Sequence, residues 1–260
     1  MEEAQLKNWK EKLVNDMNKK LGLPFDSFEE LKHIFNWSFA LENYKQEDLV
    51  LIGGWAVHSF NPWKFSLDID FLATNRFKDV LKNYLYSNRN YTKERDPSGN
   101  NIFLKVLDSG KIYIDFISKR DRFHGTDKTL DLTKLKYRTI VQNISYSSTS
   151  EFQVVAPEIS LLLLLKLKAA WDRYNDLKDE SILYHDYLEE KFTKDCGDII
   201  ALLQSNKFQF AEFDWLSLII SKFDFLKSFL EQGVVEKNST YDLISVERAK
   251  ELIKKFISQI

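Results

Sequence analysis

The chain has 260 residues, of which 44% are hydrophobic and 29% charged, a composition typical of a globular protein with a substantial core. Its formal net charge of −2 excludes a global attraction to nucleic acid or to an anionic membrane, so contact with a polyanion requires a local basic patch. The single cysteine excludes an internal disulfide framework, and the four histidines show no spacing typical of a zinc site.

The beginning of the sequence and its most apolar run indicate a protein without a membrane span. The opening stretch, MEEAQLKNWKEK, is charged and lacks the apolar segment of a signal peptide. The run ISLLLLLKLKAAW is interrupted by Lys166 and Lys168 and is too short to cross a bilayer. We therefore expect a cytoplasmic location and no membrane partner.

The first part of the chain predicts alternating helices and strands. Ser27, followed by Glu30, is a candidate capping box that would open a helix. Asp108-Ser109-Gly110 joins two β-rich runs and predicts a hairpin. The predicted elements are, in chain order, helices near 6–17 and from 28 to 44, a strand at 48–52, a short helix at 54–60, a strand at 66–73, a helix at 75–87, a hairpin over 101–118, a polar segment at 119–136 and a strand near 152–157.

The rest of the chain predicts helices almost throughout. Pro157 and Glu158 are typical of a first helical turn. Helical patterns follow at 157–174, 181–192, 194–204, 213–232 and 245–259. The sequence therefore predicts an α+β fold, with a small mixed sheet and N-terminal helices in residues 1–155 and a C-terminal helical bundle in residues 156–260.

Two carboxylates, Asp68 and Asp70, lie in the second predicted strand. Because side chains alternate along a strand, both are expected on one face, with Leu67, Ile69 and Phe71 facing the core. Such a carboxylate pair suits Mg²⁺ or Mn²⁺, which leave positions open for substrate phosphates. The alternative for this pair taken alone is a solvated strand edge.

Three further features favour the metal site. Gly53 and Gly54 follow a buried strand, where glycine permits close backbone approach to phosphates, although a plain tight turn is the alternative. Lys64 and Ser66 alternate onto the same predicted face as the two aspartates. Asp115 lies in the centre of an apolar strand, where a carboxylate needs a partner, and it would add a metal ligand and activate an attacking hydroxyl.

This arrangement resembles the polymerase-β-like nucleotidyltransferase superfamily. The shared signature is Ile52 before Gly53-Gly54, a spacer, Asp68-Ile69-Asp70, and a third carboxylate on a later strand, here Asp115. Within that superfamily the motif GGWAVHSFNPWKFSLDIDF is similar to that of AbiE-type toxin nucleotidyltransferases, which usually carry arginine at the position of Lys64. The swap keeps the charge but loses bidentate phosphate contact.

The resemblance extends to two helical segments, although their motifs are less specific. It implies that Lys166 is an active-site lysine near the nucleotide phosphates, and that Asp195 and Asp198 are the late acidic residues of the nucleotide site. The alternative for Lys166 is a buried lysine that pairs with Asp195 or Asp198 across two packed helices. For Arg173, one helix-face repeat beyond Lys166, the resemblance implies a helper role, and a solvated helix surface is the favoured alternative.

The resemblance implies a metal-dependent enzyme. It would transfer a nucleoside monophosphate from a nucleoside triphosphate to an acceptor hydroxyl and release pyrophosphate. A tRNA acceptor is expected if the protein is a toxin with a cognate antitoxin. The basic segments 93–105 and 118–138 are then candidate RNA surfaces, with solvated loops as the alternative. The other readings are transfer to a small molecule of the antibiotic type, and a non-catalytic member that binds nucleotide or a partner.

Overall fold

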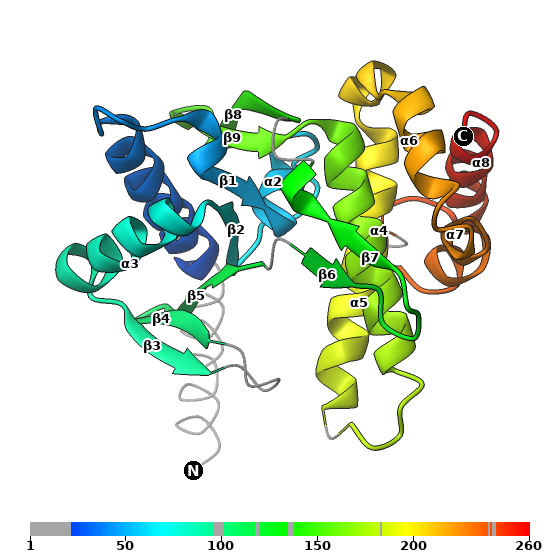
Figure 1. The fold of residues 1–260 in the computed structure, drawn as a ribbon, viewed down its shortest axis with the longest axis horizontal. Coiled ribbons are helices and arrows are strands. Elements are labelled where there is room, and N and C mark those ends of the chain that lie inside the picture. Colours follow the sequence, from blue (N-terminus) through cyan, green and yellow to red (C-terminus); the bar gives the residue numbers. More distant parts are fainter. Residues whose placement is uncertain are drawn as a thin grey trace, which may run out of the picture. The chain divides into compact units, whose positions relative to one another are not determined.

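The computed structural model describes residues 22–95, 101–117, 120–134, 138–182, 184–238, 240 and 243–260 (Figure 1). The chain divides into two compact units. Of the described residues, the first unit contains those within 22–55, 64–117 and 141–155, and the second contains those within 56–63, 120–140 and 156–260. The predicted helix near residues 6–17 lies outside the described residues.

The first unit is built on a mixed five-stranded sheet in the order β1-β2-β5-β4-β3. Its strands are β1 (Leu49–Ile52), β2 (Ile69–Ala73), β3 (Thr92–Arg95), β4 (Asn101–Leu107) and β5 (Gly110–Phe116). β2 and β5 run parallel, whereas every other neighbouring pair is antiparallel. The predicted hairpin is therefore β4–β5, and the two strands that carry the predicted carboxylates are direct neighbours.

Two helices pack on this sheet. Residues 22–39 are helical, and their apolar residues at Phe28, Leu31 and Phe35 are fully buried because they recur on one helix face. Helix α3 (Asn75–Arg89) begins where the Thr74 hydroxyl accepts a hydrogen bond from the Phe77 amide, and it ends at Asn90, which adopts the left-handed conformation. The helix predicted at 75–87 is therefore confirmed, and it continues two residues further, to Arg89.

The predicted capping box at Ser27 and Glu30 is wrong, because both residues lie inside the helix of residues 22–39. Ser27 instead accepts a hydrogen bond from Trp55 Nε1 at 3.0 Å. The Glu30 carboxylate is nearly buried and forms ion pairs with Arg89 at 2.5 Å and with Lys105 at 2.7 Å. A tertiary charge cluster therefore replaces the local cap.

Glu30→Gln is expected to lower the free energy of unfolding by about 2–3 kcal/mol, because it leaves two enclosed cations without their carboxylate. Burial alone would raise the pKa of Glu30, but the hydrogen bonds from Arg89 and Lys105 outweigh it and hold the pKa below its usual 4.5. Because the folded-state pKa of Glu30 is lowered, the stabilising contribution of its ion pairs is fully present above pH 4.5. That contribution is lost as the pH falls through the folded-state pKa.

Urea unfolding at several pH values checks this expectation, with Glu29→Gln as the matched control. Glu29 is 29% exposed and pairs with Lys32 at only 3.4 Å, so its loss is expected to cost less than about 1 kcal/mol. Equal losses of unfolding free energy in the two variants would contradict the assigned role of Glu30. A difference between the two losses that does not become smaller in acid would contradict it as well.

A second hairpin, β8 (Thr139–Ser147) with β9 (Ser150–Pro157), follows the sheet in sequence. The predicted strand near 152–157 is confirmed as part of β9, whereas β8 was not predicted. The segment predicted as merely polar contains a small two-stranded sheet, β6 (Arg120–Arg122) with β7 (Thr129–Asp131). Short exposed strands carry too few apolar residues to give a periodic signal.

The second unit is mainly helical. Helices α4 (Ile159–Asp176) and α5 (His185–Gln204) run side by side, and α6 (Phe213–Ile220), α7 (Phe225–Glu236) and α8 (Val246–Ile257) follow (Figure 1). The patterns at 181–192 and 194–204 belong largely to one helix, α5. The pattern at 213–232 divides instead, because a turn from Ile220 to Phe223 precedes a new cap at Asp224.

The described chain is therefore a mixed α+β protein with a small mixed sheet and a helical second part, as the sequence predicts. The longest segment of the second unit begins at Ala156, and the shorter segments 56–63 and 118–140 join it from the earlier part of the chain. None of the described helices combines the length and hydropathy that a membrane span requires.

Candidate active site

Asp70 and Asp115 are register partners on the parallel strands β2 and β5. Residues directly opposite on neighbouring strands project from the same face, so the sheet places these two carboxylates side by side. Both residues are half-buried, and Asp115 Oδ1 accepts a hydrogen bond from the Phe116 amide at 2.6 Å. A half-buried carboxylate pair of this kind favours a cation between its members.

Gly53 lies against the Asp70 carboxylate. Ile52, the last residue of β1, is the register partner of Asp70, and α2 (Gly53–His58) begins at the next residue. Gly53 has a φ of +67°, and a Cβ at this position would lie 2.7 Å from Asp70 Cγ and closer still to Oδ2. The missing side chain at Gly53 therefore makes room for the Asp70 carboxylate itself, which is the immediate reason for glycine here.

The predicted line of side chains from Lys64 to Asp70 on one strand face is wrong, because β2 begins only at Ile69. Ser66 is buried and donates a hydrogen bond to the Asp68 carbonyl at 3.1 Å, a local bond that competes with strand pairing. Lys64 is exposed, and Leu67, predicted to face the core, is 42% exposed. Asp68 is half-buried just before the strand.

Asp70 and Asp115 fit a metal site that is completed by substrate. Among the described residues, no three or more His, Cys, Asp or Glu side chains are grouped so that they could hold a metal ion. The register pair, Asp70 and Asp115, still fits Mg²⁺, which is commonly bound through one or two carboxylates together with substrate phosphates rather than by an all-protein cage. A nucleotide-dependent metal site is therefore compatible with this arrangement, whereas the described part of the chain contains no preformed three-carboxylate site.

Lys166, Asp195 and Asp198 come together in the second unit, between α4 and α5. The Lys166 ammonium lies 2.9 Å from Asp195 Oδ1 and 2.6 Å from Asp198 Oδ2, and the three side chains are 7%, 6% and 2% exposed. Asp198 also accepts a hydrogen bond from Trp63 Nε1 at 3.1 Å. This geometry is the buried cross-helix pairing that was the alternative for Lys166.

Arg173 completes this group, which we call the Lys166 cluster: Lys166, Arg173, Asp195 and Asp198. The prediction of a solvated Arg173 is wrong, because its guanidinium forms an ion pair with Asp195 Oδ2 and is 30% exposed. The spacing of Lys166 and Arg173 on one helix face was the sequence signal for this pairing. Two cations and two carboxylates thus balance one another in the cluster.

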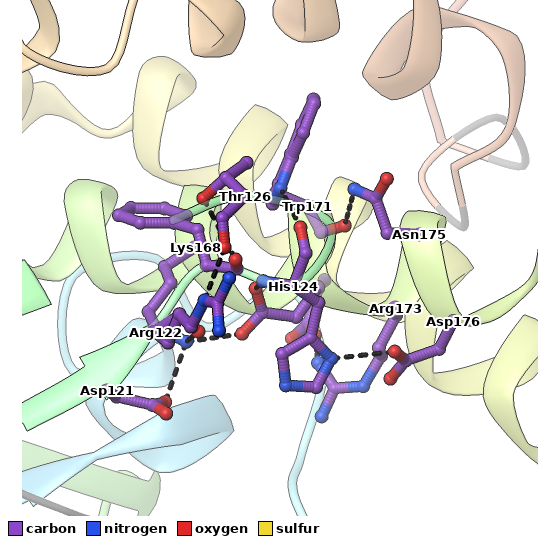
Figure 2. Close-up of polar contacts among 12 residues, drawn as sticks. Asp121, Arg122, His124, Thr126, Lys168, Trp171, Arg173, Asn175 and Asp176 are labelled. Atoms are coloured by element: carbon purple, nitrogen blue, oxygen red, sulfur yellow. Dashed lines mark hydrogen bonds and ion pairs between the residues drawn. The ribbon is translucent and has the colours of Figure 1, made fainter. Parts of the chain in front are cut away.

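A second charged cluster, which the sequence did not reveal, joins the turn between β6 and β7 to α4 (Figure 2). Lys168 is buried and pairs with Asp172 and, at 2.6 Å, with Asp121. His124 Nδ1 lies 2.6 Å from Asp176 Oδ1, and the His124 backbone amide donates to Asp172 at 2.9 Å. The available signal was the spacing of residues 168, 172 and 176, which places them on one face of a helix.

This cluster borders an open hollow lined by Arg122, His124, Gly125, Thr126 and Asp127. Burial raises the pKa of Asp172, and the attraction of Lys168 offsets only part of that effect. Trp171 Nε1 donates a hydrogen bond to the His124 carbonyl at 2.9 Å. Both the backbone and the side chain of His124 therefore contact α4. The contacts indicate that the turn is held in place, and they identify no reactive group.

No protein-family model matches the chain, and a search of curated proteins finds no relative either. The geometry of the described residues is therefore the basis for the assignment of function.

Proposed function

We propose that the chain is a metal-dependent nucleotidyltransferase that moves a nucleoside monophosphate from a nucleoside triphosphate to an acceptor hydroxyl. The observation that carries this proposal is the register pairing of Asp70 with Asp115, with the Gly53 backbone against Asp70. Two half-buried carboxylates lie on neighbouring strands, next to a glycine that cannot be replaced without a clash. The fold therefore holds this pair in a defined position, which a solvated strand edge would not require.

The residues of the first unit have the following roles in the proposal. Asp70 and Asp115 would hold Mg²⁺ or Mn²⁺ together with the substrate phosphates, and Asp68 lies half-buried just before β2, outside any preformed three-carboxylate group of the described residues. When bound, the metal would neutralise charge on the triphosphate. Asp115 accepts the proton of the attacking hydroxyl, which adds to the α-phosphorus as pyrophosphate leaves. Gly54 and the exposed Lys64 are candidate phosphate contacts.

The proposed acceptors are tRNA and a small molecule, and the basic segments of the chain bear on the choice between them. The basic segments 93–105 and 118–138 lie partly outside the described residues. Within the second segment, Arg138 pairs with Glu158 at 2.8 Å and with Glu212 at 2.7 Å, and Arg120 pairs with Asp131 at 3.4 Å. These cations are largely matched by acidic partners, so the described residues supply little support for tRNA over a small-molecule acceptor, and a cognate antitoxin is likewise only a proposed partner.

A second candidate function is nucleotide binding without turnover. It is favoured by the absence, among the described residues, of a three-carboxylate group ready to hold metal. It predicts that triphosphate and Mg²⁺ bind but no label is transferred.

The decisive experiment combines purified chain and Mg²⁺ with each α-labelled nucleoside triphosphate and with RNA, protein and small-molecule acceptors. Asp70→Asn is expected to reduce transfer about a thousandfold, because charge neutralisation by a catalytic metal is worth several kcal/mol. The matched control is Asp79→Asn on α3, whose carboxylate is 77% exposed and which should retain full activity.

The outcomes separate the two functions. Transfer that depends on Asp70 supports the enzyme, and Asp70-dependent binding without transfer supports the binding protein. If the unaltered chain neither binds nor transfers any of the nucleotides, both are wrong.

A further inference from the structure

The five-stranded sheet of the first unit has one face that two helices cover. Phe35, in the helix of residues 22–39, contacts Phe71 of β2 with ring centroids 6.0 Å apart. Tyr86 of α3 contacts Phe103 of β4 at 5.4 Å. The strand registers place Phe71 and Phe103 on the same side of the sheet, so both helices pack on that one face.

Tyr113 lies on the opposite face, together with the carboxylate pair. Asp70 alternates with Phe71 along β2, and Asp115 is the register partner of Asp70, so both carboxylates project away from the two helices. Tyr113 comes two residues before Asp115 on the same strand, β5, and shares its face. Because two residues along a strand span about 7 Å, the sheet itself sets Tyr113 beside Asp115.

On this face Gly53 and Tyr113 flank Asp70 from different strands. Gly53 follows β1 and lies against Asp70, whereas Tyr113 belongs to β5, on the other side of β2. The proposed function assigns the phosphates to the glycine side and the attacking hydroxyl to Asp115. Tyr113 is therefore on the side from which the acceptor would approach.

The Tyr113 side chain has hydrogen-bonding capacity that the fold does not use. It is half-buried, and no residue within the described ranges forms a hydrogen bond, an ion pair or a ring contact with it. A partly enclosed tyrosine hydroxyl usually has a partner, because withdrawing it from water costs free energy. The hydroxyl can thus bond to a bound molecule.

The residues around Tyr113 on this face carry little net charge. Leu104 is directly opposite on β4 and is 9% exposed, and Val106, two residues further on the same face, is 66% exposed. Lys111 and Glu94, exposed on the same face, have opposite charges. A phosphate chain requires several cations, which the described residues of this face do not present. An uncharged ring with hydroxyl groups, such as a sugar, matches a tyrosine hydroxyl next to apolar side chains.

We propose that Tyr113 binds the acceptor, through a hydrogen bond between its hydroxyl and an uncharged sugar ring that carries the attacking hydroxyl. The inference rests on the proposed function, in which the acceptor oxygen bonds to the α-phosphorus, the bond to pyrophosphate breaks, and Asp115 takes the proton. The same chemistry is present in the terminal ribose of an RNA and in a free nucleoside, and Tyr113 would contact either source in the same way.

Steady-state transfer by the full chain in Mg²⁺ tests this, with the four α-labelled nucleoside triphosphates in turn and with tRNA and adenosine as acceptor probes. Tyr113→Phe removes only the hydroxyl. The KM for the probe that accepts label is expected to rise about fivefold, the effect of one neutral hydrogen bond, while the KM for the nucleotide stays unchanged. Tyr86→Phe is the matched control, since Tyr86 is 40% exposed and lies against the helix-covered face.

The outcomes separate this inference from the proposed function. Label on tRNA alone identifies the ribose of an RNA as the acceptor, and label on adenosine as well identifies the free sugar; either result supports the inference if the KM for that probe depends on Tyr113. An unchanged acceptor KM in Tyr113→Phe, or a raised nucleotide KM in its place, would overturn it. If another acceptor is labelled but neither probe is, the sugar acceptor is wrong and the proposed function stands. If the unaltered chain labels no acceptor at all, the enzymatic function is wrong, and this inference with it.

Discussion

Gly53→Ala is expected to destabilise the chain and to displace the Asp70 carboxylate from its position beside Asp115. A Cβ at Gly53 would lie 2.7 Å from Cγ and 2.9 Å from Cβ of Asp70, closer than non-bonded atoms approach in folded proteins. The φ of +67° adds the cost of a left-handed conformation for alanine, about 1–2 kcal/mol. Because β1 and β2 are held in register, the backbone has little freedom to relieve the overlap.

Urea unfolding and nucleotide transfer measure the two consequences separately. Gly54→Ala is the matched control for the unfolding measurement alone, because Gly54 is itself a candidate phosphate contact and because, among the described glycines, the positive φ values belong to Gly53, Gly110 and Gly125. Adding Asp70→Ala to Gly53→Ala removes the closest atoms of the clash, so stability should recover in part while transfer stays lost. A Gly53→Ala variant with normal stability would show that the Asp70 side chain moves away at no cost in free energy. That result would contradict the proposal that the fold holds Asp70 in place beside Asp115.

Lys166→Met is expected to lower the free energy of unfolding by about 3–5 kcal/mol, the usual cost of removing one partner from a buried ion pair. The substitution leaves Asp195 and Asp198 enclosed at 6% and 2% exposure, with Arg173 as the remaining cation of the Lys166 cluster. Two carboxylates that share one cation repel each other in a low-dielectric site, so the native state loses more than the packing of one side chain.

The matched control is Lys250→Met, the same substitution at an exposed position on α8, which should change stability by less than about 0.5 kcal/mol. In a double-mutant cycle, Asp198→Asn should be far less harmful in the Lys166→Met background than alone, because both changes disrupt one network. Additive losses would contradict the pairing. Transfer activity of Lys166→Met, measured well below its unfolding midpoint, tests whether this lysine also serves the nucleotide phosphates.

Local patterns in the sequence were sufficient for several elements of the fold. The hairpin β4–β5 follows from two β-rich runs around Asp108-Ser109-Gly110, and α3 follows from the apolar face of the helix predicted at 75–87. The same reasoning failed at Ser27 and Glu30, where a cap pattern lies inside a helix. Glu30 is held by Arg89 and Lys105, which are distant in sequence, and no local pattern contains that information.

The candidate site divides in the same way. The sequence by itself determined which carboxylates and glycines are candidates for the site, because Asp68, Asp70, Asp115 and Gly53 are unusual next to apolar strands. It also determined the change from a mixed α/β part to a helical part, since hydrophobic periodicity is a property of neighbouring residues.

Only the tertiary structure decided how these groups meet. The parallel pairing of β2 with β5 sets Asp70 opposite Asp115, and the approach of β1 places Gly53 against Asp70. The packing of α4 on α5 buries Lys166 with Asp195 and Asp198. Strand register and helix packing depend on contacts between residues far apart in the chain, whose energies appear only when the whole core assembles, and for that reason these pairings come from the fold.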